Sequence, residues 1–278
     1  MRTFLYTSFA LVAFAFNSIL CRLALRGEEA DAVGFTVVRL VSGAVMLIFI
    51  SYFFSRSKGH VKSGSWGSAG FLFAYAICFS IAYLGLTAGT GALMLFGSVQ
   101  MTMVAVAIFK GERPSALEWL GLIVAVGGLV YLVFPGLASP PLYNSLLMAA
   151  AGASWGFYTL RGRSTSDPLA DTTGNFVRAL PFAAIVSIIF LPNLHLSTSG
   201  ITLAVLSGAV TSGIGYTVWY VALKPHTATR AAVLQLAVPV IAAAAGIVFL
   251  AEAANVRLVI AAGLILGGIG LTIAGRRR

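Results

Sequence analysis

The stretch Val38-Arg39-Leu40 places an arginine inside a long apolar segment, and Val177-Arg178-Ala179 repeats this arrangement half a chain later. Further landmarks recur at almost the same offset: Lys110-Gly111-Glu112 as Leu250-Ala251-Glu252, Gly127-Gly128 as Gly267-Gly268, and Arg22 as Arg161. A near-constant offset of this kind indicates that the chain is a duplication of one unit. We therefore predict two domains, a first repeat over residues 1–138 and a second over residues 139–278.

The composition places both repeats in a membrane. Hydrophobic residues make up 59% of the 278-residue chain and charged residues only 9%, whereas a soluble domain carries about 25% charged residues. The apolar segments are long, which predicts α-helices, because a β-barrel would show short alternating segments. A net charge of +10 would suggest a nucleic-acid partner in a soluble protein. Here the basic residues cluster at the ends of apolar segments, so we expect a surrounding lipid bilayer and no nucleic-acid partner.

About 20 mostly apolar residues are needed to cross a bilayer. This rule predicts an all-α polytopic membrane protein with ten transmembrane helices joined by short connections. The first apolar segment reaches spanning length, so we interpret it as a span and not as a cleaved signal peptide. The predicted spans are Phe4–Cys21, Val33–Phe54, Ser68–Leu86, Thr90–Phe109, Ala116–Phe134, Tyr143–Leu160, Thr173–Leu191, Ile201–Leu223, Ala228–Leu250 and Val256–Gly275.

The distribution of lysine and arginine predicts the orientation. With a cytoplasmic N-terminus, 13 of the 18 basic residues fall on the cytoplasmic side, 3 fall in outer loops (Arg22, Arg26 and Arg257) and 2 lie within spans. This bias follows the positive-inside rule and predicts that both termini are cytoplasmic. Because each repeat has five spans, an odd number, the second repeat must enter the bilayer from the opposite side. We therefore predict an inverted-topology repeat, the usual construction of a secondary transporter whose substrate site lies between the halves.

Several segments carry a resemblance to a known family. They are residues 214–223 (Ile-Gly-Tyr-Thr-Val-Trp-Tyr-Val-Ala-Leu), residues 231–240 (Ala-Ala-Val-Leu-Gln-Leu-Ala-Val-Pro-Val), residues 249–252 (Phe-Leu-Ala-Glu), and in the first repeat residues 93–100 (Leu-Met-Leu-Phe-Gly-Ser-Val-Gln) and 110–114 (Lys-Gly-Glu-Arg-Pro). The pattern resembles the EamA-type repeat of the drug/metabolite transporter superfamily, and most nearly the bacterial amino-acid exporters of the YddG kind. The resemblance implies a protein of the bacterial inner (cytoplasmic) membrane that exports aromatic and other neutral amino acids by alternating access.

Two arginines lie inside predicted spans, where a charge is costly and normally faces a partner, a cavity or the membrane surface. Arg39 is six residues into its span, roughly 9 Å deep at 1.5 Å per residue, and Arg178 is similarly shallow from the cytoplasmic side. One interpretation is that they contact the substrate carboxylate or gate the two mouths of the pathway; their near-symmetric placement favours a shared gating role. The alternative is that their side chains reach the membrane surface or form structural hydrogen bonds.

Amide and aromatic side chains complete the predicted substrate site. Asn17, Gln100 and Gln235 lie within spans, where hydrocarbon cannot satisfy an amide, so each either binds the polar head of a substrate or joins helices. Deep aromatic rings can stack on an organic substrate and still offer a polar tip. Six of them are expected where the halves meet: Tyr83, Trp155, Tyr158, Tyr216, Trp219 and Tyr220.

The distribution of acids limits the mechanism. No Asp or Glu lies in the middle of a predicted span, and Glu112 and Glu252 close spans at opposite surfaces. Proton relays and sodium sites usually place acids within the bilayer, so facilitated export is favoured, while an ion site built from backbone carbonyls stays open. There is no nucleotide-binding loop, and Cys21 and Cys78 match no metal-ligand spacing. We therefore expect neither cofactor nor metal.

Two other functions fit parts of the pattern. A multidrug or other-metabolite exporter, coupled to protons, would share this architecture. An intramembrane enzyme would need catalytic groups at depth, and no HExxH, nucleophile elbow or paired aspartates occur, so we predict a transporter and not an enzyme. Small residues also predict close packing of the last span (Gly263, Gly267) on the fifth (Gly121, Ala125), with a dimer contact as the alternative.

Overall fold

The computed structural model describes residues 2–54, 63–109, 111, 115–134, 139–162, 165–223, 234–253 and 255–275. Lys110, Glu112 and most of the basic residues assigned above to the cytoplasmic side lie outside this described part. These basic residues are Arg56, Lys58, Lys62, Arg113, Arg163, Lys224, Arg230 and residues 276–278.

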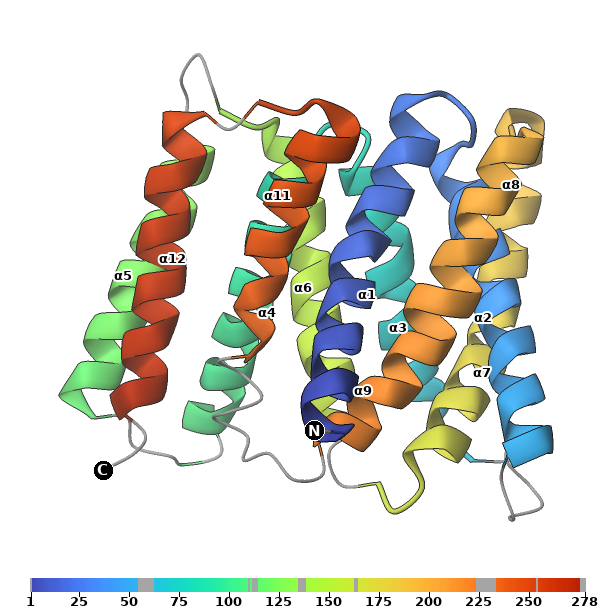
Figure 1. Cartoon of the computed structure of the whole chain (residues 1–278), viewed down its shortest axis with the longest axis horizontal. Helices are drawn as coiled ribbons and strands as arrows, with labels where there is room; N and C mark the ends of the chain where they lie inside the picture. Colours follow the sequence, from blue (N-terminus) through green and yellow to red (C-terminus); the bar gives the residue numbers. More distant parts are fainter. Residues whose placement is uncertain are drawn as a thin grey trace.

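Helices that stand side by side form the molecule (Figure 1). They are α1 (Arg2–Arg26), α2 (Ala32–Phe54), α3 (Trp66–Ala82), α4 (Ala88–Phe109), α5 (Ala116–Val133), α6 (Leu142–Gly162), α7 (Pro168–Ile189), the short 3-10 helix η2 (Leu191–Asn193), α8 (Thr198–Val205), the π-helix η3 (Leu206–Ile214), α9 (Gly215–Leu223), α11 (Ala237–Leu250) and α12 (Val256–Gly275). The helices α5 and α12 form a pair at one edge of the bundle, and α2, α7 and α8 lie at the other (Figure 1). α1 begins and α12 ends at the same end of the bundle (Figure 1).

The fold is that of a polytopic membrane protein. Seven helices in the described part of the chain are long and apolar enough to cross a bilayer, and α3 and α11 are shorter apolar helices. Large apolar side chains are exposed, among them Phe109 at 90%, Val248 at 74% and Val256 at 74%. Such exposure suits a lipid environment, which is as apolar as the side chains themselves. The all-helical membrane fold is therefore confirmed, whereas the count of ten spans and the side of the termini stay predictions.

Side-chain caps fix where several helices begin. Ser65, Ser115 and Ser197 each accept a hydrogen bond from a backbone N–H in the first turn of α3, α5 and α8, a role for which serine is strongly preferred. Asp167 caps α7 directly before Pro168, whose fixed φ suits the first helical position. These helix starts follow from local sequence and do not depend on tertiary packing.

The structure adds detail to two of the predicted spans. Arg22 and Arg26, expected in an outer loop, lie on the last turns of α1, which continues past the predicted end at Cys21. Arg22 donates to Glu252, directly after α11, and Arg26 donates to the Leu250 carbonyl at the end of α11. The eighth predicted span, Ile201–Leu223, falls within a single apolar stretch over Thr198–Ala222 apart from its last residue, and this stretch passes from α8 through the π-helix η3 into α9.

The α5–α12 pair packs as predicted, but in a different register. An added Cβ at Gly268 would lie 2.5 Å from the backbone atoms Ala125 N and Gly121 O. At Gly263 and Gly267, the two glycines we expected at this contact, an added Cβ would meet nothing within 4 Å. Close backbone approach therefore depends on Gly268, Gly121 and Ala125, which meet across the contact like other small-residue membrane packings.

We expect Gly268→Ala to destabilise the protein and Gly267→Ala to leave it intact. At Gly268 the new methyl group would collide with backbone that cannot turn aside, a form of overpacking that typically costs about 1–3 kcal/mol. Thermal unfolding of both variants in the same detergent measures the difference. Equal melting temperatures would show that α5 and α12 separate without cost at this point.

Candidate functional site

Arg39 on α2 is buried in the interior of the bundle, with 2% of its surface exposed. Its Nε donates to Ser212 Oγ at 3.2 Å, and its Nη2 donates to the hydroxyls of Tyr75 at 3.0 Å and Tyr216 at 3.3 Å. Its guanidinium carbon also lies 5.1 Å from the ring centroids of Tyr75 and of Phe79, within the range of a cation–π contact. The side chain therefore does not reach the membrane surface. Its hydrogen bonds to neighbouring helices agree with the other form of the structural alternative.

No carboxylate in the described part of the chain is paired with Arg39. Arg22 and Glu252 form an ion pair with each other, near one end of the bundle. In addition, Nη1 of Arg39 is buried and has no hydrogen-bond partner among the described residues. Burying a charge is costly unless it is paired and hydrogen-bonded, so Arg39 retains a donor and a charge for an anionic group. Seven acids are described, each in a loop or in the first turn of a helix: Glu28, Glu29, Asp31, Glu118, Asp167, Asp171 and Glu252.

The π-helix η3 brings polar side chains to this site. Ser207 and Thr211 donate to Asn17 Oδ1 at 2.6 and 3.2 Å. Asn17 in turn donates through Nδ2 to the Tyr75 hydroxyl at 3.2 Å, and Tyr75 accepts from Arg39. One network thus connects α1, α2, α3 and η3. Such π-helical turns occur frequently at functional sites, because they shift the side chains that follow them.

A small cavity of about 20 Å³ lies beside this network. This volume is close to that of one bound water and far below the several hundred Å³ of a typical metabolite site. This cavity is therefore too small for a metabolite, and a substrate could enter it only if the helices that line it separated. The lining residues are Phe14, Asn17, Tyr75, Phe79, Leu95, Phe96, Trp155 and Tyr216.

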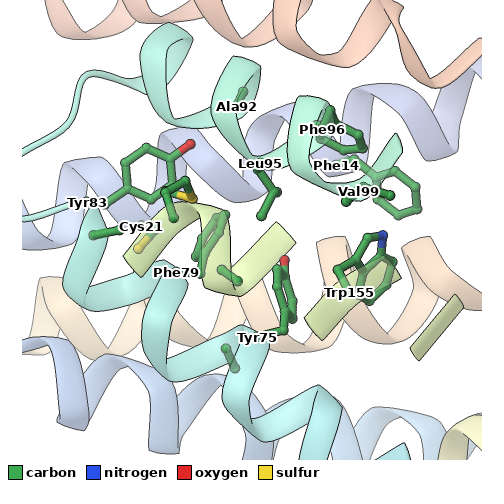
Figure 2. Packing of buried hydrophobic residues seen from close by; sticks show 14 of the residues in the cluster. Phe14, Cys21, Tyr75, Phe79, Tyr83, Ala92, Leu95, Phe96, Val99 and Trp155 are labelled. Atoms are coloured by element: carbon green, nitrogen blue, oxygen red, sulfur yellow. The ribbon is translucent and has the colours of Figure 1, made fainter. Parts of the chain in front are cut away.

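Aromatic rings form most of the cavity wall. Trp155 lies 4.9 Å from Tyr75 and 4.8 Å from Tyr216, measured between ring centroids. Phe14 meets Tyr216 edge-on at 5.8 Å, and Figure 2 shows Phe14, Tyr75 and Trp155 gathered at one end of the buried cluster. Arg39 contacts this wall through Tyr75, Phe79 and Tyr216. The site thus combines one cation with aromatic faces.

The structure brings part of the predicted set together. Asn17, Trp155 and Tyr216 line the cavity. Tyr158 stacks on Trp155 at 5.4 Å and Trp219 packs on Phe14 at 5.6 Å, so these two rings lie one layer behind the wall.

The other predicted residues lie elsewhere. Tyr83 donates to the Ala88 carbonyl at 3.3 Å and lies at the opposite end of the cluster from Trp155 (Figure 2). Gln100 and Gln235 are buried but do not line the cavity. The Arg178 guanidinium bonds the backbone carbonyls of residues 63 and 174, as the structural alternative for this side chain predicts. Tyr220 lies near Gly162, at the end of α6.

Several residues of the site were not predicted. Tyr75 and Phe79 were missed although they precede Tyr83 at intervals of four residues, a spacing that places all three rings on one helical face. In the sequence, Leu95 and Phe96 cannot be distinguished from ordinary apolar residues of a helix core. The roles of Ser207 and Thr211 depend on the π-helix, which hydrophobic periodicity does not indicate.

Charged side chains connect three helices near one end of the bundle. Glu252, directly after α11, accepts from Arg22 Nε at 3.3 Å and from the Ala88 N–H, at the start of α4, at 2.8 Å. Arg22 also donates to the Tyr83 carbonyl at 2.8 Å. Glu252 thus caps the start of α4. The helix that it caps belongs to the other predicted repeat, so this residue connects the two halves.

Comparison with known proteins gives a consistent picture. The pattern of the EamA-like transporter family matches residues 143–274. An uncharacterized protein of Pseudomonas aeruginosa is 48% identical over 275 residues, which cover 99% of this chain and 96% of that protein. The threonine/homoserine exporter RhtA of Escherichia coli is 27% identical over 183 residues, 63% of this chain and 60% of the exporter. An uncharacterized transporter of Archaeoglobus fulgidus is 28% identical over 209 residues, 73% of this chain and 74% of the transporter.

A solved structure shows the same fold. One crystal structure of a protein superimposes with a TM-score of 0.69 over 99% of both chains, at 19% sequence identity. At this identity the likeness concerns the fold alone. The sequence relatives, in contrast, point to a membrane transporter and away from an enzyme.

Proposed function

This chain belongs to the EamA-like transporter family, and from that premise we propose that it exports small metabolites carrying a carboxylate, with aromatic and other neutral amino acids as the first class to test. The export crosses the bacterial cytoplasmic membrane by alternating access between two inverted five-helix repeats.

The observation that carries this proposal is the buried, unpaired guanidinium edge of Arg39. It adjoins a cavity wall made of Tyr75, Phe79 and Tyr216. A carboxylate bound there would satisfy Nη1 and neutralise the charge, and an aromatic side chain would stack on Trp155. Hydrogen bonds to a charged partner are the strong ones, so this contact gives both affinity and orientation.

Hydrogen bonds at the two ends of the bundle support the inverted repeat. Asp31, beside the start of α2, accepts from the His195 N–H at 2.7 Å, in the loop before α8. Asp171 follows on α7 at almost the same offset as the other repeat landmarks, and it accepts from the Gly64 N–H at 3.0 Å, in the loop before α3. Equivalent acids therefore hold equivalent loops at opposite ends, as a pseudo-two-fold axis in the membrane plane requires.

Alternating access needs one closed end at a time. We propose that Arg22 and Glu252 close the outer end. Their counterparts in the repeat are Arg161 and Glu112, which would close the cytoplasmic end in the opposite state. Glu112 lies outside the described residues, and Arg161 donates to Ser68 Oγ at 3.1 Å.

The charge of the site bears on the alternative functions. A multidrug exporter for organic cations would bring its substrate against Arg39, which repels cations at short range. Proton coupling would need a titratable acid at depth, and the described acids lie at helix ends and in loops. Both points favour a uniporter for molecules with a carboxylate.

Counterflow into proteoliposomes tests the proposal. We expect vesicles preloaded with phenylalanine to take up labelled phenylalanine without ATP and with little effect of a pH gradient. Phenethylamine, which is the same molecule without the carboxylate, should neither exchange nor compete. Threonine belongs in the same series, because the relative RhtA is named as its exporter. If phenethylamine competed as well as phenylalanine, the proposed carboxylate contact would be excluded. Strict dependence of uptake on an imposed proton gradient would exclude the uniport mechanism.

A further inference from the structure

The charges around the cavity do not match those of an amino acid. A zwitterion carries one carboxylate and one ammonium group. The site offers Arg39 to the carboxylate, but the cavity is lined by seven apolar or aromatic residues and one neutral amide, Asn17. Among the described residues no acidic side chain belongs to this lining, and each acid lies in a loop or in the first turn of a helix.

An ammonium group at this centre would meet two costs. It would leave water without gaining a carboxylate partner, and burial of an unpaired charge is expensive. It would also lie close to the Arg39 guanidinium, because the residues that form the wall are the ones that hold Arg39. Two like charges a few ångströms apart repel strongly in a medium of low dielectric constant.

Given the proposed function on which it rests, we infer that the preferred substrate is a net anion: an aromatic monocarboxylate without an ammonium group, such as a 2-oxo acid. A bound carboxylate would neutralise Arg39 and leave no charge without a partner. Aryl 2-oxo acids differ from the aromatic amino acids in having a keto oxygen in place of the ammonium group, for which the site offers no acidic partner.

This substrate charge supplies a driving force. A complete transport cycle returns Arg39 to its starting position, so the net charge moved per cycle is that of the substrate alone. A membrane potential that is negative inside drives a monoanion outward, and 100 mV acts on one charge with about 2.3 kcal/mol, the equivalent of about a 50-fold concentration ratio. Export would then need no coupling ion, in agreement with the absence of a described acid at depth.

The test compares phenylpyruvate with phenylalanine in the same proteoliposomes. Valinomycin and a potassium gradient set a potential of about 100 mV, negative inside, and the steady-state distribution of each labelled substrate is measured. We expect phenylpyruvate to reach an outside-to-inside ratio of about 50 and phenylalanine to stay near 1. Phenylpyruvate should also compete with phenylalanine counterflow at a concentration at least tenfold lower than unlabelled phenylalanine does. Protein-free liposomes report leakage of the acid.

Each outcome separates the two proposals. If phenylalanine exchanges and phenylpyruvate does not, the inferred substrate class is wrong and the proposed exporter stands. If phenylpyruvate moves but ignores the potential, its carboxylate travels with a cation and electrogenic export is excluded. If neither compound exchanges, the proposed function itself fails.

A designed pair of variants gives independent evidence. Leu95 lines the cavity, so Leu95→Asp would place a carboxylate where none lies, and Leu95→Asn is the neutral control of the same size. We expect the Asp variant to shift the preference from phenylpyruvate toward phenylalanine by at least tenfold relative to the Asn variant. An unchanged ratio between two folded variants would show that charge does not set the selectivity of this site.

Discussion

Replacing Arg39 with glutamine should lower the apparent affinity for carboxylate substrates by about 10- to 150-fold. Hydrogen bonds to charged groups are worth roughly 1.5–3 kcal/mol, and tenfold corresponds to about 1.4 kcal/mol. Glutamine keeps an amide near Tyr75 but removes the charge and the planar fork of donors. Arg39→Lys keeps the charge alone and should give an intermediate loss, because an ammonium group cannot reproduce the planar set of donors that bonds Ser212, Tyr75 and Tyr216 and still leaves Nη1 for the substrate. Concentration-dependent counterflow measures both variants.

A structural role of Arg39 predicts a different pattern. Its bonds to Tyr75, Tyr216 and Ser212 hold α2, α3, η3 and α9 together, so stability must be measured separately. We expect the melting temperature of the wild-type protein to rise on addition of substrate, and that rise to vanish in Arg39→Gln. A variant that melts earlier but keeps the full rise would assign Arg39 to packing and not to binding.

Arg178 provides the matched control. It occupies the corresponding place in the second repeat, but its guanidinium bonds the backbone carbonyls of residues 63 and 174. Arg178→Gln should therefore leave substrate affinity within about threefold of wild type, a difference of less than about 1 kcal/mol. A loss as large as that of Arg39→Gln would indicate that both arginines serve the substrate, as their symmetric placement in the sequence first suggested.

The sequence predicted the arginine and several of the aromatic residues that the structure brings together at the candidate site, because such residues are rare at depth in a membrane. An arginine or a tryptophan far from the ends of an apolar segment needs an explanation, and this requirement identified Arg39 and Trp155. The same requirement could not identify Tyr75 and Phe79, because aromatic rings buried among other rings are common in the core of any membrane protein. It also assigned Tyr83 and Tyr220 to the cavity on the basis of symmetry, although the lining does not include them.

The fold was easier to predict from the sequence than the site, and the reason is physical. Span positions follow from hydrophobic length, which is a local property summed over about 20 residues. Contacts such as Ser207 to Asn17 depend on a π-helical turn within the eighth span. That turn depends on how tightly η3 packs on α2, where an added Cβ at Gly208 would collide with Ser42 and the Arg39 carbonyl. Tertiary packing of this kind leaves no periodic trace in the sequence.

Replacing Glu252 with glutamine should open the outer end of the bundle and expose Cys21. Cys21 is fully buried on α1, directly before Arg22, and Figure 2 shows it beside Tyr83. In a Cys78→Ala background it is the one thiol of the chain, so a membrane-impermeant maleimide added outside reports its exposure. The substitution removes the charge that holds Arg22, and a loss of about 1.4 kcal/mol from closure raises the open population tenfold. We therefore expect at least tenfold faster labelling.

The control removes a different contact at the same end of the bundle. Arg257 donates to the Tyr131 and Phe134 carbonyls across the α5–α12 pair, away from the cavity, so Arg257→Gln should leave Cys21 protected. Labelling that accelerates equally in both variants would mean general loosening and not the opening of a gate.

The transport cycle distinguishes a gate from a simple structural link. Because Glu252 connects α11 to α1 and α4, loss of its charge should favour the outward-open state over the inward-open one. A substrate binds a protein more tightly when its binding-competent state is more populated. Glu252→Gln should therefore show higher apparent affinity for substrate added outside, together with slower turnover, because the return to the closed state becomes limiting. Reduced turnover with unchanged affinity and unchanged Cys21 labelling would assign the ion pair to stability alone and leave the outer gate to other residues.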